Sequence, residues 1–277
     1  MADKKVADRF LGSFCVREFV FDGAGALMGE VNQERVLRSD KGGGMIVRQK
    51  CRPCGALMAG PMGRFKGEFV FSLRKEGYNR LYEGEDVVGF GREISPGFMV
   101  GEGVWPRFGW NFRSFSILVD KGLQLTGGTF YRGGEVCCEI IGVATPMEDK
   151  EKLPRSLLSF TVKDGEGEGF TLKRGQLTKS PLKRRSVVPE GFCDVSLQGE
   201  HHYLLTPRES GFAVSLNGSY VGMGRYYGPA AKWQVYGTGG ESIWGMDLVC
   251  PLTGGQFGLR HKVKFGETVY FKSIKIA

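Results

Sequence analysis

The sequence lacks the motifs of several common enzyme classes. It contains only three histidines, and none of them lies in a nucleophile-elbow motif, so nothing supports a Ser-His-Asp triad. No apolar run reaches the roughly 18 residues that a membrane helix requires. The basic N-terminal segment has no apolar core of the kind found in secretion signals. We therefore expect a folded cytoplasmic protein without membrane insertion.

Complete metal and redox motifs are also missing. The pair Cys51 and Cys54 forms a single CxxC, whereas a structural zinc site normally needs four ligands. A redox CxxC is expected at a strand-to-helix junction, and no helix follows here. Two other pairs fall on predicted strands, where neighbouring residues face opposite sides: Cys137–Cys138 and His201–His202. We expect no metal, no organic cofactor and mostly reduced cysteines.

Glycine is abundant, and alternation of apolar and polar residues dominates the chain. The 277 residues include 44 glycines, many of them in turn-like pairs. Phe69, Phe71 and Leu73 point to one face of a predicted strand and Glu68, Ser72 and Arg74 to the other, as expected for a half-buried antiparallel strand. Asn217-Gly218 predicts a type I′ hairpin turn. Helical patterns are confined to residues 2–11 and 147–158. The predicted fold class is all-β, with antiparallel barrels or half-barrels and very little helix.

A weak internal repeat divides the chain into two halves. Residues 88–92, Val-Gly-Phe-Gly-Arg, recur as Val-Gly-Met-Gly-Arg at 221–225, an offset of 133 residues. The end of each half also matches at this offset, in residues 141–144 and 274–277. We therefore predict two barrel units, over residues 1–146 and 156–277, and a charged linker over 147–155.

The start of the chain resembles lipocalin-like (calycin) domains. Residues 9–14, Arg-Phe-Leu-Gly-Ser-Phe, precede a predicted strand and the turn Asp22-Gly23, although Ser13 follows the glycine where the family usually has Trp. In that family a short helix leads into a glycine-aromatic first strand. Two tandem barrels of this kind imply binding of an apolar or amphipathic small molecule. Some members catalyse cyclisation, isomerisation or chromophore attachment.

Residues 101–113 combine aromatic rings with arginine. Trp105, Trp110 and Arg107 predict an amphipathic pocket mouth, in which arginine holds an anionic group and the rings cover apolar surface. The second half offers Trp233 as a corresponding aromatic contact. The alternative is a loop whose rings only close one end of a barrel.

The repeated Gly-x-Gly is followed by Arg92 in one half and by Arg225 in the other. It lacks the third glycine and the βαβ setting of a dinucleotide fingerprint. Either arginine is a candidate anion anchor, with an exposed charge at a strand end as the alternative. Tyr82 and Tyr226 are candidate acid–base groups, with sheet packing as the alternative.

Two charged stretches remain. Residues 173–185 carry six cations but no interleaved aromatics, so we interpret them as a solvated linker or loop and do not expect a nucleic-acid partner. Residues 164–169, with Glu166 and Glu168, are interpreted as a solvated acidic loop.

Two function classes follow. In the first, a barrel encloses an apolar or amphipathic small molecule. If the protein is an enzyme, the reaction is a cofactor-free cyclisation or isomerisation that uses Arg92, Tyr82 and Tyr226. In the second, the protein is not an enzyme, and its basic loops bind an acidic protein or nucleic acid.

Overall fold

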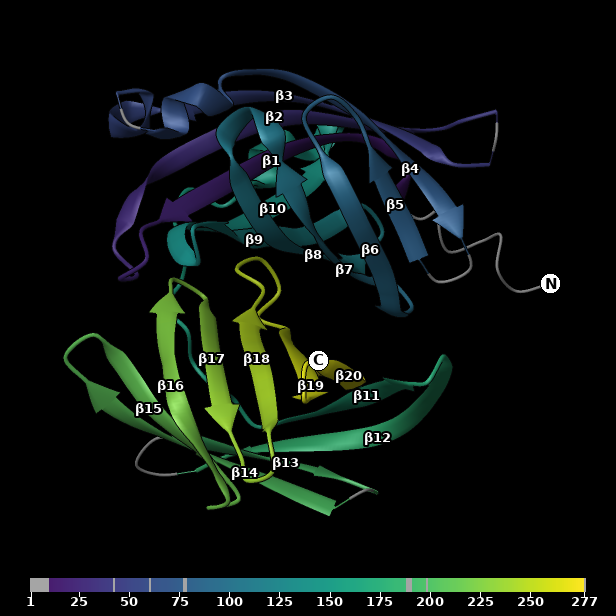
Figure 1. Cartoon of the computed structure of the whole chain (residues 1–277). Coiled ribbons are helices and arrows are strands. Elements are labelled where there is room, and N and C mark those ends of the chain that lie inside the picture. The colour runs from purple at the N-terminus through teal and green to yellow at the C-terminus, as the bar shows by residue number, and fades with distance from the viewer. Residues whose placement is uncertain are drawn as a thin grey trace. The chain divides into compact units, whose positions relative to one another are not determined.

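The computed structural model describes residues 10–276, except for residues 42, 60, 77–78, 188–190 and 198. The chain divides into two compact units, Met1–Arg155 and Ser156–Ala277. Each unit is an antiparallel β-barrel in which strands that are consecutive in the sequence pair with each other (Figure 1). The predicted all-β fold class with two tandem barrels is confirmed.

The first barrel closes where β1 pairs with both β2 and β10. Ten strands are defined among its described residues: β1 (Gly12–Phe21), β2 (Leu27–Ser39), β3 (Met45–Cys54), β4 (Gly67–Glu76), β5 (Asn79–Glu83), β6 (Val88–Ser95), β7 (Phe98–Trp105), β8 (Trp110–Asp120), β9 (Leu123–Arg132) and β10 (Glu135–Pro146).

The second barrel closes in the same way, where β11 pairs with both β12 and β20. Its described residues also form ten strands: β11 (Gly165–Lys173), β12 (Gln176–Ser186), β13 (Gly191–Ser196), β14 (Gly199–Arg208), β15 (Gly211–Leu216), β16 (Tyr220–Tyr227), β17 (Ala230–Tyr236), β18 (Glu241–Val249), β19 (Gln256–Lys264) and β20 (Glu267–Ile276).

Alternating burial explains why these segments form strands. In β4 Phe69 and Leu73 are buried inside the barrel, whereas Glu68 and Val70, on either side of Phe69, are exposed. The predicted hairpin lies between β15 and β16. Asn217 and Gly218 have φ values of 51° and 67°, and Ser219 N donates to Leu216 O at 3.1 Å, as a type I′ turn requires.

Aromatic side chains fill one part of the first barrel. The β3–β4 connection carries two 3₁₀ helices, η2 (Gly55–Met58) and η3 (Pro61–Phe65), and η4 (Pro106–Phe108) joins β7 to β8. Phe65 stacks on Phe108 with ring centroids 4.6 Å apart and meets Trp105 edge-on at 5.2 Å. These rings form one buried cluster with Trp110 and Phe130, which anchors the connections to the barrel wall.

Several local predictions differ from the structure. Residues 164–169 are not a loop, because β11 begins at Gly165 and pairs along β12. Residues 173–185 are not a solvated linker either, since most of them form β12. Burial alternates in the second half of β12, where Ser180, Leu182 and Arg184 are buried, and the high charge of the segment hid that alternation.

The helical patterns have a mixed outcome. Within 147–158 the structure has a 3₁₀ helix, η5 (Met147–Lys152), and it belongs to the first compact unit. The predicted helix over 2–11 lies mostly outside the described residues. No helix in the described part of the chain has the length and apolar character needed to span a membrane. The predicted domain boundaries remain a prediction.

Candidate functional site

The first barrel encloses a cavity of about 180 Å³. Its wall is mainly apolar, with Phe65, Phe112, Phe115 and Phe130 among the lining residues. β9 contributes Gly127 and Gly128, which have no side chain to fill the space. Part of the wall is shared with the aromatic cluster described above, so the cavity adjoins a rigid packed region. An apolar cavity with a few polar groups is the usual form of a small-molecule site.

A polar cluster on β1 and β2 forms one part of the cavity wall. Arg35 Nη2 donates to Gln33 Oε1 at 3.0 Å and lies 3.5 Å from Glu18 Oε1. All three residues are more than nine-tenths buried and line the cavity. Burial raises the pKa of Glu18 above its ordinary value of 4.5, and the nearby charge of Arg35 only partly offsets this. Protonation of Glu18 would leave the guanidinium as the net charge of the cluster.

Two buried nitrogens at the cavity have unused hydrogen-bonding capacity. Within the described residues, neither Arg35 Nε nor Trp105 Nε1 has a hydrogen-bond partner, and both side chains line the cavity. A buried donor without a partner costs about 1–3 kcal/mol. An acceptor atom placed in the cavity would compensate that cost. The cavity is thus suited to a molecule that is largely apolar and carries at least one acceptor.

Tyr82 lines the same cavity and hydrogen-bonds to Ser114. Burial raises the pKa of Tyr82 to about 12, although Arg80 and Ser114 act in the opposite direction. A methyl group on Gly91 or Gly101 would lie 2.8 or 2.7 Å from the Tyr82 hydroxyl oxygen. Gly91 of the repeated motif and Gly101 on β7 therefore make room for this side chain. At neutral pH the phenol is a proton donor.

The other candidates from the first half lie outside the cavity lining. Trp110 is buried in the aromatic cluster. Arg107 is exposed, forms an ion pair with Asp86 at 2.7 Å and lies over the ring of Phe69. Arg92 is half-buried and donates from Nε to Asn79 Oδ1 at 3.0 Å.

The candidates from the second half do not form one group. Arg225 donates from Nε to the carbonyl oxygen of Ser210 at 3.3 Å. Tyr226 packs its ring against Phe160 and Phe212. Trp233 is buried in the second barrel and donates from Nε1 to Asp247 Oδ2 at 3.2 Å. The structure therefore brings only Tyr82 and Trp105 of our candidates together, at the first barrel's cavity.

Buried ion pairs occupy the interior of the second barrel. Arg184 donates to both carboxylate oxygens of Asp194, at 2.7 and 2.9 Å, and to Asp247 at 3.0 Å. Arg260 donates to Asp247 at 2.8 Å and to the hydroxyl of Tyr203 at 3.2 Å. Burial alone would raise the pKa of Asp194, but the two arginines hold it below its ordinary value of 3.8. Two cations and two anions thus balance within this group.

This network removes the basis for a continuous basic patch. Arg184 belongs to the run that we interpreted as solvated, yet its side chain is fully buried. Its neighbour Lys183 forms an ion pair with Glu166 at 2.9 Å, and Lys179 pairs with Glu168. Neutralised and buried cations do not favour binding of an acidic protein or nucleic acid.

The CxxC does not act as a unit. Cys51 is buried and lines the cavity, whereas Cys54 is exposed and accepts a hydrogen bond from Asn32 Nδ2. Burial raises the pKa of Cys51 to about 12. The two thiols lie on opposite faces of β3 and cannot share a ligand.

Sequence reasoning missed the polar cluster of the cavity. Glu18, Gln33 and Arg35 occupy strands whose burial alternates, and two of them lie among many other charged residues of β2. The available signal was their spacing. Gln33 and Arg35 lie two and four residues after Val31, so all three side chains point to the same face of a strand as this apolar residue. We predicted a strand before Asp22-Gly23, which includes Glu18, but none over Gln33 and Arg35.

Comparisons with known proteins extend the description of the fold. No protein-family model and no curated protein matches the sequence. A protein of unknown function of the DUF3598 family from Nostoc punctiforme superimposes with a TM-score of 0.63. The match covers 99% of this chain and 98% of that one, at 12% sequence identity. This likeness shows a shared fold.

A second match is much weaker. Kievitone hydratase from Nectria haematococca is matched over 98% of this chain and 90% of that one, at 10% identity and a TM-score of 0.22. That score is too low to indicate a common arrangement of strands. Of what the lipocalin-like resemblance implies, the structure shows the two tandem antiparallel barrels.

Proposed function

We propose that the first barrel binds an amphipathic small molecule that carries a carboxylate or carbonyl group. The observation that carries this proposal is the pair of buried donors, Arg35 Nε and Trp105 Nε1, which line one cavity and have no hydrogen-bond partner among the described residues. One acceptor group on a ligand near either donor would recover its lost hydrogen bond.

The wall composition supports an aromatic or otherwise unsaturated ligand. Phenylalanine rings line the cavity together with Trp105, and rings of this kind pack favourably against flat π-systems. The cluster of Glu18, Gln33 and Arg35 makes another part of the cavity wall polar. Its guanidinium matches a carboxylate, because charge-assisted hydrogen bonds from arginine are among the strongest in proteins.

If the protein also acts on its ligand, we propose a cofactor-free isomerisation or cyclisation in this cavity. Glu18 is the group best suited to move a proton, because its raised pKa lies closer to neutrality than that of an exposed carboxyl. Tyr82, with a pKa of about 12, would donate a hydrogen bond to a carbonyl oxygen. Arg92 and Tyr226 have no part in this proposal, since neither lines the cavity.

Binding of cinnamate tests the proposal, because this small aromatic molecule carries one carboxylate. We expect saturable binding by the full chain in titration calorimetry, weakened at least about tenfold by Arg35→Met, which removes the charge but keeps the stem. Cinnamyl alcohol, which has no carboxylate, should be much less sensitive to Arg35→Met.

The matched control is Arg48→Met on β3. Arg48 is exposed and pairs with Glu68 at 3.0 Å, so its loss should leave cinnamate binding unchanged. Equal weakening by both substitutions, or no binding by the unmodified chain, would contradict the proposed site.

A further inference from the structure

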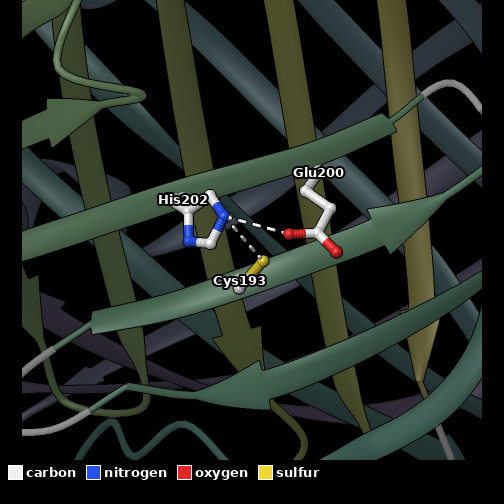
Figure 2. Close-up of side chains that lie close together, drawn as sticks. All are labelled: Cys193, Glu200 and His202. Atoms are coloured by element: carbon white, nitrogen blue, oxygen red, sulfur yellow. Dashed lines mark hydrogen bonds and ion pairs between the residues drawn. The ribbon is translucent and has the colours of Figure 1, made fainter.

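Three metal-ligating side chains meet on the second barrel, away from its buried ion pairs. Cys193 lies on β13, and its direct partner across the sheet is His202 on β14. Glu200 precedes His202 by two residues and therefore shares its face of β14. Figure 2 shows the imidazole ring of His202 next to both the thiol and the carboxylate. Asp194, the next residue after Cys193, faces the barrel interior, so this group lies on the outer face.

The distances match the edges of a zinc coordination tetrahedron. Zinc bonds of about 2.3 Å to sulfur and about 2.0 Å to nitrogen or oxygen give a sulfur–nitrogen edge of about 3.5 Å and a nitrogen–oxygen edge of about 3.3 Å. In the structure Cys193 Sγ lies 3.7 Å from His202 Nε2, which lies 3.2 Å from Glu200 Oε2. All three ligand atoms lie within 4.8 Å of one another. The side chains thus need little movement to hold an ion.

We propose that Cys193, Glu200 and His202 form a binding site for one zinc ion. Thiolate, imidazole and carboxylate are the three side-chain ligands that zinc takes in proteins. Among the described residues no fourth Cys, His, Asp or Glu joins the group. The fourth position is therefore left for water or another exogenous ligand, as in zinc sites that keep an open position.

The local backbone supports this arrangement. Cys193 and His202 are held opposite each other by the β13–β14 ladder, and His202 N also donates to Asn217 Oδ1 at 2.7 Å. All three ligands come from two adjacent strands rather than from loops, so the β-ladder holds them close together before an ion binds.

Arg185 carries a positive charge close to this site and would repel a bound cation. It is the direct partner of Cys193 on β12, and its side chain is exposed on the same face. The thiolate and the Glu200 carboxylate together carry two negative charges against this one. An anion in the open position would be favoured by both the metal and Arg185.

Cobalt substitution tests the proposal on the full, reduced and chelator-treated chain. We expect one Co²⁺ per chain, with a thiolate-to-cobalt charge-transfer band and the intense visible bands of tetrahedral cobalt. Zn²⁺ should displace the cobalt and abolish both signals. Cys193→Ser should abolish the charge-transfer band, and His202→Gln should weaken zinc binding at least about tenfold.

Matched variants control for other thiols and histidines. Cys54→Ser removes an exposed cysteine of the first barrel, and His201→Gln removes the histidine beside His202; both should retain the cobalt spectrum. Persistence of the charge-transfer band in Cys193→Ser would overturn the assignment. So would a wild-type chain that binds neither ion, or His201→Gln losing the spectrum while His202→Gln keeps it.

Discussion

At the scale of single residues, Asp247 has the largest expected effect on the second barrel. It accepts hydrogen bonds from Arg184, Arg260 and Trp233, all of them buried. Without the charge of Asp247, the guanidinium groups of Arg184 and Arg260 would have Asp194 as their one carboxylate partner in this network. Buried ion pairs are balanced in this way because removal of one partner leaves an uncompensated charge in a medium of low polarity.

We therefore predict that Asp247→Asn destabilises the protein by about 3–5 kcal/mol, measured by urea unfolding of the full chain. Asp149→Asn is the control, since Asp149 pairs with Lys152 at the surface and its loss should change the free energy of unfolding far less. A similar loss in both variants would show that the buried network contributes no more than a surface pair.

Glu18 gives a prediction with a definite sign. Its pKa in the folded protein is raised above 4.5, so the carboxyl takes up a proton at a higher pH than an exposed glutamate would. Loss of its negative charge frees Arg35 for a ligand carboxylate. We predict that cinnamate binding tightens as the pH falls and Glu18 takes up its proton, over the range in which cinnamate itself stays ionised.

Glu18→Gln should remove this pH dependence and bind cinnamate at neutral pH at least as tightly as the unmodified chain. Calorimetric titrations at several pH values would measure both effects. The assignment fails if the variant retains the full pH dependence, because another group would then be responsible. Cys51 is excluded as that group by its own pKa of about 12.

At the scale of strands and turns, the sequence patterns were most informative where one face meets the core and the other meets water. β4 and β15 alternate in this way, and Asn217-Gly218 places two positive φ values where the turn needs them. In these segments the buried positions follow from the alternation of neighbouring residues, so they can be predicted from the sequence.

Prediction failed where burial depends on distant partners. Arg184 stands between exposed Lys183 and Arg185 and looks like part of a solvated cationic run. It is buried because Asp194 and Asp247, 10 and 63 residues away, neutralise it. No local pattern contains that information. The same holds for Arg35, whose position at a cavity depends on closure of the whole barrel.

Two strand glycines, Gly91 on β6 and Gly101 on β7, give a prediction about the packing of Tyr82. A methyl group on Gly101 would lie 2.7 Å from the Tyr82 hydroxyl oxygen and 2.9 Å from Ser114 Oγ. We predict that Gly101→Ala displaces Tyr82, weakens binding of both cinnamate and cinnamyl alcohol, and costs about 1–3 kcal/mol in urea unfolding.

Gly169→Ala on β11 is the control for the loss of a strand glycine. There the nearest atoms lie at ordinary contact distances of 3.4–3.6 Å, so we expect little change in stability or binding. Unchanged ligand binding in Gly101→Ala would contradict a role of Tyr82 in the binding site.

At the scale of the whole molecule, the two barrels share a strand order but differ in their interiors. In the next-to-last strand of the first barrel, β9, Gly127 and Gly128 border a cavity. In the next-to-last strand of the second, β19, Arg260 enters an ion network. One architecture thus surrounds a cavity in the first unit and a buried network of ion pairs in the second.

Because contacts cluster within each unit, we predict that residues 156–277 fold when expressed alone. The isolated segment should show a β-type circular dichroism spectrum and a cooperative urea transition. An unfolded segment would mean that the second barrel depends on the first for its stability.

Native mass spectrometry of the gently purified full chain tests the central claim most directly. The account predicts a small-molecule mass increment that is lost on denaturation and absent from Arg35→Met, or, for protein purified without ligand, one such increment after incubation with cinnamate. A bare mass under both conditions would contradict a binding cavity in the first barrel, and an increment that Arg35→Met retains would contradict the role of Arg35.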